Sequence, residues 1–386
     1  MFIPYGNHQI DDDDINAVVD VLKNHFLTQG QKVPEFEQAI ADYCQVSYCT
    51  AVNSGTSALH VACLALGVTK GDRVWTTPNT FVASANCALY CGATIDFVDI
   101  DPATRNISLP ELTKKLTQAK LTNSLPKVLM AVHFAGLPCD MKAIKALSNE
   151  FGFKIVEDAS HALGSFYNEL PVGNCLYSDF TVLSFHPVKP ITTAEGGALL
   201  TNNECLYKRS GLFAKHGVTR APDLIEDQYK SQDDGAWYYQ QIELGYNYRL
   251  SDLQAALGLT QLTKLDGFIN KRRQLWQRYT EKLAHLPLVL PIEPNYAKSG
   301  WHIYVVEVTN HDRQHVFNQL IEQGIGVQVH YIPVHLQPYY QKLGFSVGDF
   351  PCAEAYYAGA ITLPLFPHLT FEQQDYVIAT MESILG

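Results

Sequence analysis

The sequence lacks the features that mark nucleic-acid-binding, membrane and secreted proteins. Basic residues are few, since 28 Lys and Arg stand against 39 Asp and Glu, for a net charge of −11. An acidic chain without a basic run is a poor partner for nucleic acid. No apolar run approaches the ~20 residues that a membrane helix needs. The first residues also lack a basic stretch followed by an apolar one. We therefore expect neither a membrane partner nor a secretory signal.

Cysteine and histidine patterns are missing as well. The chain has nine cysteines and fourteen histidines, but neither Cys-x-x-Cys nor His-Glu-x-x-His. Neither a metal site nor a disulfide framework is therefore indicated. The scattered cysteines are typical of small buried hydrophobes in a reducing compartment, which favours the cytoplasm. Walker loops and the Gly-x-Gly-x-x-Gly dinucleotide pattern are also absent, so those two nucleotide-binding folds have no support.

The apolar pattern predicts an α/β domain followed by a smaller one. With 386 residues, 47% of them hydrophobic, the chain is long enough for about two domains. Short β-branched runs alternate with helical periodicity, which predicts a mainly parallel sheet with helices on both faces. The expected strands lie at 73–77, 93–100, 127–136, 154–160, 179–185 and 197–202. The expected helices lie at 56–66, from about 81, at 108–119 and at 141–151.

A change of pattern marks the C-terminal part. A long helical segment covers 250–286, and a strand at 302–309, a helix at 313–323 and alternating residues at 326–333 follow it. These elements predict a smaller α+β domain. We place the division so that residues 1–255 form the large domain and residues 256–386 the small one. At the other end, the acidic residues 11–14 precede apolar residues at helical spacing and predict a helix N-terminus.

Three polar features follow predicted strands, where α/β sheets bind ligands. Gly55 and Thr56 open a helix, which suits a phosphate, although an ordinary helix cap fits as well. Asp158 ends an apolar strand, where a carboxylate is costly unless it meets a cation; a cap or a surface salt bridge is the alternative. Ser184 ends another strand, and Lys189 follows between two prolines. Burial and nearby positive charge lower a lysine pKa and make its amine a nucleophile.

These features together fit one cofactor. Pyridoxal 5'-phosphate requires a lysine for its aldehyde, an acid opposite its ring nitrogen and a phosphate site. The order of the three features along one α/β domain is therefore more informative than any one of them. His161, three residues after Asp158, could bind a ligand or pack in the core.

Five segments resemble the DegT/DnrJ/EryC1/StrS sugar aminotransferases, which have the type I fold of pyridoxal-phosphate enzymes. They are NSGTSAL (53–59), TTPNTFVASANCAL (76–89), EDASHALGS (157–165), SFHPVKPITTAEGGAL (184–199) and LGYNYRLSDLQAALGL (244–259). The resemblance covers essentially the whole chain. It implies that Lys189 holds the cofactor as a Schiff base and moves the substrate proton, and that Asp158 keeps the ring nitrogen protonated.

The same resemblance implies roles for the other cofactor residues. Phe81 would stack on the ring, with core packing as its alternative, and His161 would lie near it. Gly55, Thr56 and Ser184 would hold the phosphate. Asn247 would reach the phosphate of a neighbouring subunit, which implies a homodimer with shared active sites. Arg249 could meet a carboxylate or a nucleotide phosphate, or form a surface salt bridge.

Within the family, the runs HPVKPITTAEGGA, FLTQG and QVHYIP most resemble members that act in pseudaminic acid biosynthesis. Such members aminate carbon 4 of UDP-4-keto-6-deoxy-N-acetyl-β-L-altrosamine, usually with L-glutamate as donor. The residues implied to line the substrate site are Tyr5, His25, Phe26, Leu27, Thr28, His330 and Tyr331. Two features depart from this subgroup: Gly55 stands where it can have alanine, and residues 220–241 resemble an insertion.

Three alternatives stay open. The chain could be another nucleotide-sugar 3- or 4-aminotransferase of the same family. A relative with histidine at the lysine position dehydrates sugars, but this chain has Lys189 there. Non-catalytic sugar-nucleotide binding relatives would be expected to lack Lys189 or Asp158, and both residues are present.

Overall fold

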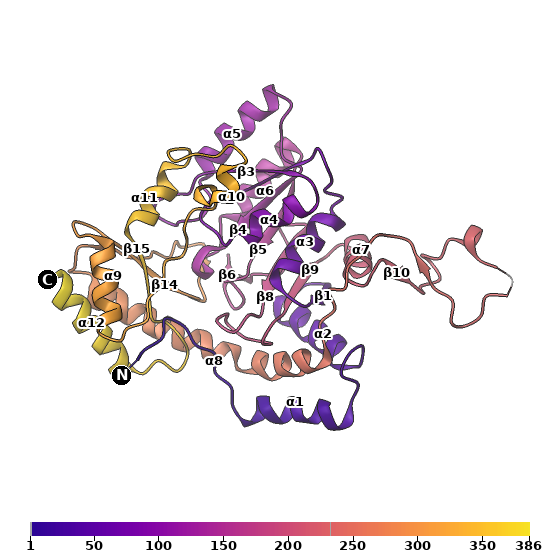
Figure 1. Cartoon of the computed structure of the whole chain (residues 1–386), viewed down its shortest axis with the longest axis horizontal. Helices are drawn as coiled ribbons and strands as arrows, with labels where there is room; N and C mark the ends of the chain where they lie inside the picture. The colour runs from indigo at the N-terminus through magenta and orange to yellow at the C-terminus, as the bar shows by residue number, and fades with distance from the viewer. Residues whose placement is uncertain (1, 232) are drawn as a thin grey trace.

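A seven-stranded sheet forms the centre of the molecule, as seen in a computed structural model that describes residues 2–231 and 233–386 (Figure 1). The strand order is β1-β9-β8-β5-β4-β2-β3. The strands are β1 (Tyr48–Val52), β2 (Arg73–Thr76), β3 (Thr94–Phe97), β4 (Val128–Val132), β5 (Lys154–Asp158), β8 (Phe180–Ser184) and β9 (Gly197–Thr201). Neighbouring strands are parallel except where β9 pairs with β1 and β8. The predicted mainly parallel sheet is confirmed.

Both faces of this sheet are covered, because alternate strand residues are buried on opposite sides. Val74 and Met130 pack with helices α3 and α4, whereas their neighbours Trp75 and Leu129 pack with α5 and α6. The helices of the large part are α1 (Asp12–Asn24), α2 (Lys32–Cys44), α3 (Gly55–Ala65), α4 (Ala83–Tyr90), α5 (Leu109–Leu121), α6 (Met141–Phe151) and α7 (Glu204–Ala214). The short strands β6 (Phe166–Tyr167), β7 (Leu170–Pro171) and β13 (Ala297–Lys298) form a separate small sheet.

The long helix α8 (Asp252–Leu283) connects the two parts of the molecule. Its N-terminal portion, up to Leu265 and Ile269, packs in the core of the large part, and its C-terminal portion, from Leu275 to Leu283, packs in the core of the C-terminal part. The helix is thus continuous across residues 255 and 256, where the sequence places the domain division. A single helix that belongs to both cores has no break in its periodicity at the point where its environment changes.

Helix α1 packs against α8 through a buried carboxylate. The Asp14 side chain is fully buried and accepts hydrogen bonds from Thr260 Oγ1 at 2.6 Å and Gln261 Nε2 at 2.8 Å. It also pairs with Lys264 Nζ at 2.9 Å. The acidic residues 11–14 therefore do more than favour the helix N-terminus: Asp11 is the N-cap, and Asp14 faces inward.

The C-terminal part is built on an antiparallel sheet of β12 (Leu288–Val289), β14 (Tyr304–Val308) and β15 (Ala360–Leu363). Its helices are α9 (Arg313–Glu322), α10 (Pro338–Gln341), α11 (Pro351–Gly359) and α12 (Phe371–Leu385). The N-terminal segment joins this part, since Ile3 forms a parallel bridge with Ile325. Both chain ends accordingly lie near each other in this part of the molecule (Figure 1).

The alternating residues 326–333 do not form a regular strand. Gln328 forms an isolated antiparallel bridge with Thr362 of β15, and this bridge joins the segment to the C-terminal sheet. Val327 packs in the C-terminal core, while Val329 and Tyr331 pack against the core of the large part. The apolar alternation therefore reflects a segment that crosses between two cores.

Within the segment 220–241, residues 220–231 and 233–241 belong to an arm that extends away from the large part (Figure 1). The short strands β10 (Val218–Thr219) and β11 (Gln240–Gln241) pair at its base. Trp237, at 71% exposure, and Tyr229, at 70%, present aromatic surface on this arm. Within the described residues, no helix combines the length and the apolar character that crossing a bilayer requires.

Candidate active site

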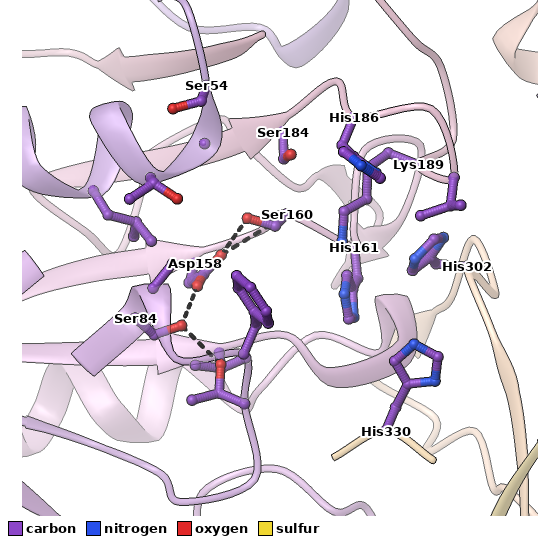
Figure 2. A pocket seen from close by; sticks show the side chains of 18 of the residues that line it. Ser54, Ser84, Asp158, Ser160, His161, Ser184, His186, Lys189, His302 and His330 are labelled. Atoms are coloured by element: carbon purple, nitrogen blue, oxygen red, sulfur yellow. Dashed lines mark hydrogen bonds between the residues drawn. The ribbon is translucent and has the colours of Figure 1, made fainter. Parts of the chain in front are cut away.

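A cavity of about 460 Å³ lies at the carboxyl ends of the central strands (Figure 2). Asp158 is the last residue of β5 and Ser184 the last of β8, and both line the cavity. Ser54 and Gly55 line it from the turn after β1. Neighbouring parallel strands end at the same edge, so residues far apart in sequence meet there.

The start of α3 forms a cradle on one side of this cavity. The Ser54 side chain caps the helix by accepting a hydrogen bond from the Ser57 N–H. The first N–H groups of a helix lack partners within it, and their partial positive charge suits an anion. A Cβ atom at Gly55 would lie 2.9 Å from Ser184 Cβ, closer than such atoms approach each other. Glycine therefore keeps open the space between the helix start and Ser184.

Asp158 is held as a buried carboxylate by two serines. Ser84 Oγ donates to its Oδ2 at 2.5 Å, and Ser160 Oγ donates to its Oδ1 at 2.6 Å (Figure 2). The Ser84 hydroxyl is also 2.7 Å from Thr80 Oγ1. Hydroxyl donors stabilise the ionised form of a carboxyl group. The side chain is thus oriented and suited to facing a cation in the cavity.

Among the described residues, Lys189 is the one lysine that lines the cavity, and no arginine lines it. Burial lowers the pKa of its amine from 10.5 to about 8, although the charge of Asp158 raises it. An amine with this pKa is neutral for part of the time near neutral pH, which a nucleophile or a proton acceptor requires.

Histidines and tyrosines form the wall opposite the cradle. His161 Nε2 lies 3.1 Å from Tyr331 Oη, and burial, with the nearby Lys189 and His330, holds the His161 pKa well below its ordinary value. Burial and the Lys189 charge also lower the pKa of His330 to about 3. These imidazoles are therefore neutral. Phe81, at 58% exposure, offers an apolar ring at the cavity rim.

The structure brings most of the sequence-predicted site residues together, but not all of them. The cavity is lined by Tyr5, Gly55, Thr56, Phe81, Asp158, His161, Ser184, Lys189, His330 and Tyr331. Residues His25, Phe26, Leu27 and Thr28 lie in the exposed loop after α1 and do not line it. Asn247 is exposed, and neither it nor Arg249 lines the cavity of its own chain. The roles of the residues outside this cavity stay predictions.

Several residues at this site were missed by the sequence reasoning. Ser160 is two residues after Asp158 in a quoted motif, a spacing that could have suggested their hydrogen bond, whereas Ser84 is 74 residues from Asp158 and gives no such signal. His302 comes from the C-terminal part, and its ring centroid lies 4.5 Å from that of His161. No local sequence pattern predicts the contact between His161 and His302, because it depends on how the two parts of the chain pack.

A second buried pair supports Asp158 from behind. Glu157, the preceding residue, lies with Oε2 2.8 Å from His133 Nε2 and accepts a hydrogen bond from Thr181 Oγ1 at 3.1 Å. His133 Nδ1 accepts the Cys139 N–H at 3.2 Å, so the ring proton is on Nε2 and points to Glu157. The backbone N–H of His133 also donates to the Asp158 carbonyl. This network fixes the end of β5.

The sheet order, the strand-end aspartate and the buried lysine define a class of protein, the pyridoxal-phosphate enzymes of fold type I. The comparisons narrow this class. The model of the DegT/DnrJ/EryC1/StrS aminotransferase family matches residues 8–382, and the chain belongs to this family. It is a pyridoxal-phosphate-dependent sugar aminotransferase.

Relatives and solved structures cover nearly the whole chain. The UDP-4-amino-4,6-dideoxy-N-acetyl-β-L-altrosamine transaminase of Campylobacter jejuni is 36% identical, over 99% of this chain and 97% of the relative. The spore coat polysaccharide biosynthesis protein SpsC of Bacillus subtilis is also 36% identical, over 100% and 97%. Helicobacter pylori PseC, an aminotransferase of pseudaminic acid biosynthesis, superposes with a TM-score of 0.90 at 30% identity, over 100% and 99% of the chains.

The described residues fit the cofactor. The glycine cradle at α3 leaves room for a phosphate where a side chain would collide with Ser184. The amine of Lys189, whose pKa is lowered to about 8, and the carboxyl group of Asp158 line the same cavity. When bound, pyridoxal phosphate supplies an electron sink for the substrate carbanion. The chain supplies the lysine, the counter-charge and the anion site.

Proposed function

We propose that this protein transfers the amino group of L-glutamate to carbon 4 of UDP-4-keto-6-deoxy-N-acetyl-β-L-altrosamine in pseudaminic acid biosynthesis. The observation that carries the proposal is the likeness over nearly full length to two enzymes named for this step or pathway, at 36% identity and a TM-score of 0.90. Tyr5, His330 and Tyr331 line the same cavity as Lys189, where the sugar would enter. The cytoplasm, where nucleotide sugars are made, is the location that belongs to this proposal.

The proposal gives each site residue a role. Lys189 would hold the cofactor through its amine and, when that amine is free, would move a proton at the substrate carbon. Asp158, held by two serines, would keep the cofactor's ring nitrogen protonated. Gly55, Thr56 and Ser184 would hold the phosphate, and Phe81 would lie beside the ring. Each role rests on the cavity geometry and on the motif that the residue shares with the family.

The homodimer is also part of the proposal. Asn247 is exposed and does not line the cavity of its own chain. This exposure supports the proposal that it serves the phosphate site of a neighbouring subunit. Residues 25–28, with exposed Phe26 and Leu27, would contribute to substrate binding in the same assembly.

The test is isotope transfer to a defined carbon. The holoenzyme is incubated with the proposed ketosugar and [¹⁵N]glutamate, and the product is analysed by NMR for nitrogen on carbon 4. We expect ¹⁵N at carbon 4, and we expect no product from the Lys189→Arg variant, whose fold is checked by circular dichroism. Transamination by this variant at a near-parental rate would contradict the assignment of Lys189.

Other sugar nucleotides need the same test. SpsC and the altrosamine transaminase are both 36% identical to this chain, so identity alone does not select the substrate. A panel of UDP- and dTDP-linked 3- and 4-ketosugars separates the two possibilities. Amination of another member of the panel, with the altrosamine derivative unreacted, would replace the proposed substrate while leaving the aminotransferase class in place.

A further inference from the structure

Arg272 of α8 is a fully buried cation without an acidic partner. Its side chain is 1% exposed, and within residues 2–231 and 233–386 no Asp or Glu forms an ion pair with it. Its Nε also has no hydrogen-bond partner among these residues. Burial lowers the pKa of Arg272 to about 10, so the side chain stays charged near neutral pH. A buried charge without a counter-charge is costly, and its presence points to a role beyond packing.

The hydrogen bonds of Arg272 join two strand ends of the C-terminal part. Its Nη1 donates to the His302 carbonyl at 2.9 Å and to the Leu365 carbonyl at 2.8 Å. His302 precedes β14 and Leu365 follows β15, and these two strands pair antiparallel. Both carbonyls therefore lie at the same end of the strand pair. Because the guanidinium group is planar and rigid, it holds the two main-chain segments at a fixed separation.

Both of these segments lead to the wall of the Lys189 cavity. His302 lines the cavity itself, and its buried Nδ1 has no hydrogen-bond partner within the described residues. A buried polar atom of this kind is satisfied when a ligand group meets it. The Leu365 N–H donates to the Tyr5 carbonyl at 3.0 Å, and Tyr5 also lines the cavity. Arg272 does not line the cavity, so it acts on this wall from behind, through the main chain.

We propose that Arg272 is a positioning residue for the substrate side of the cavity, which sets where His302 and Tyr5 stand when the ketosugar binds. The inference rests on the proposed function in one respect, that a ketosugar is the ligand of this wall. The hydrogen bonds of Arg272 go to the C-terminal part, whereas Lys189 and Asp158 belong to the large part. Sugar binding therefore depends on Arg272 more strongly than the reaction of the cofactor with glutamate does.

Steady-state kinetics of the Arg272→Met holoenzyme test the functional part of the proposal. Methionine has a long apolar side chain without a hydrogen-bond donor. We expect the KM for the ketosugar to rise at least about 10-fold, while kcat stays within about 3-fold of the parental value. The rate at which glutamate changes the cofactor's near-visible absorbance should also stay within about 3-fold. The sugar used is the panel member that the parent aminates, so a wrong substrate would revise the proposed function and not this result.

Hydrogen exchange of the holoenzyme without sugar tests the positioning itself. Without the Arg272 hydrogen bonds, the contact between the Leu365 N–H and the Tyr5 carbonyl should open more often. The peptide that contains the Leu365 amide should then exchange at least about 10-fold faster, because exchange follows local opening. A peptide from β5 should not change. This measurement decides the positioning even if no ketosugar of the panel reacts with the parent.

Two further variants separate positioning from stability. Arg278→Met, on the same helix, removes a partly exposed guanidinium that pairs with Asp375, and it should leave the sugar KM unchanged. Arg272→Lys keeps a donor and should recover part of the sugar KM; it also replaces Arg272→Met if that variant fails to fold, which Tm and the cofactor absorbance show. An unchanged sugar KM in the Arg272 variants, or unchanged exchange of the Leu365 peptide, would overturn the proposal, as would an equal rise of KM in Arg278→Met.

Discussion

At the scale of single residues, the sequence predicts the reactive side chains of the site better than the side chains that orient them. Lys189 and Asp158 were found from sequence because each stands after an apolar strand, where its side chain has to reach the carboxyl edge of the sheet. Ser84, which donates to Asp158 at 2.5 Å, could not be assigned in the same way. A serine on a helix has no particular pattern, and its partner is 74 residues away. The reactive groups were predictable, but the Ser84 hydroxyl that orients Asp158 was not.

The first prediction concerns the pH dependence that Lys189 gives to the cofactor-free protein. Its pKa is about 8 in the fold and 10.5 as an unperturbed lysine. Between these values the unfolded chain binds the extra proton, so folding is favoured increasingly as pH rises from 8 to 10.5. The span corresponds to at most about 3 kcal/mol. Urea unfolding of the parent and of Lys189→Met, repeated at several pH values, should show this rise in their difference. A difference that stays flat across the window would contradict it.

At the scale of elements, the sheet and its helices were predictable because their periodicity is local. Each strand from 73 to 201 has its apolar run, and each covering helix has its own repeat. The long helix predicted at 250–286 is present as α8, but its pattern does not show that it packs in two cores. Residues 326–333 alternate because they touch two cores in turn, without forming a strand. Local pattern indicates burial but does not identify the partner in the packing.

The start of α3 gives the second prediction. Gly55→Ala should weaken cofactor binding by roughly 10-fold, since its Cβ would meet Ser184 Cβ at 2.9 Å and displace the cradle. Fluorescence titration of the cofactor-free protein with pyridoxal phosphate measures the change. Gly211→Ala on α7 is the control, because no atom lies within 4 Å of its added Cβ and alanine favours helix. Equal affinities for the two variants would show that the cradle does not depend on glycine.

The third prediction concerns the contact between α1 and α8. Asp14→Ala leaves Lys264 and Gln261 without their buried carboxylate, and we expect a loss of about 2–4 kcal/mol in the free energy of unfolding. Asp13→Ala, at an exposed position of the same turn, should cost less than about 1 kcal/mol. Both are measured by urea denaturation. A similar cost for the two would mean that the buried network contributes no more than the helix N-terminus.

For the whole molecule, the sequence indicated two parts and their classes but not how the site uses them. His302 and His330 reach the cavity from the C-terminal part, and Tyr5 reaches it from the N-terminal segment that joins that part. The arm formed by residues 218–231 and 233–241 extends away from the large part of the molecule (Figure 1). Such arrangements depend on long-range packing. The sequence indicates that residues 220–241 resemble an insertion, but it does not predict where this segment lies in the fold.

The fourth prediction tests the proposed shared site by complementation. Lys189→Ala and Asn247→Ala should each be nearly inactive as homodimers. If Asn247 serves the neighbouring subunit, a mixed dimer contains one site with both residues intact. Co-expression of differently tagged chains, followed by tandem purification, should then restore up to about half of the parental activity per dimer. A mixed dimer as inactive as its parents would place Asn247 in the site of its own chain.

Reduction with borohydride tests the central claim most directly. The holoenzyme is treated with sodium borohydride, which fixes a lysine–cofactor bond, and then digested and mapped by mass spectrometry. The account predicts that the peptide containing Lys189 gains the mass of the reduced cofactor, and that prior addition of glutamate prevents this gain. Cofactor mass on a different lysine, or on none, would contradict the assignment of Lys189 as the residue that holds the cofactor.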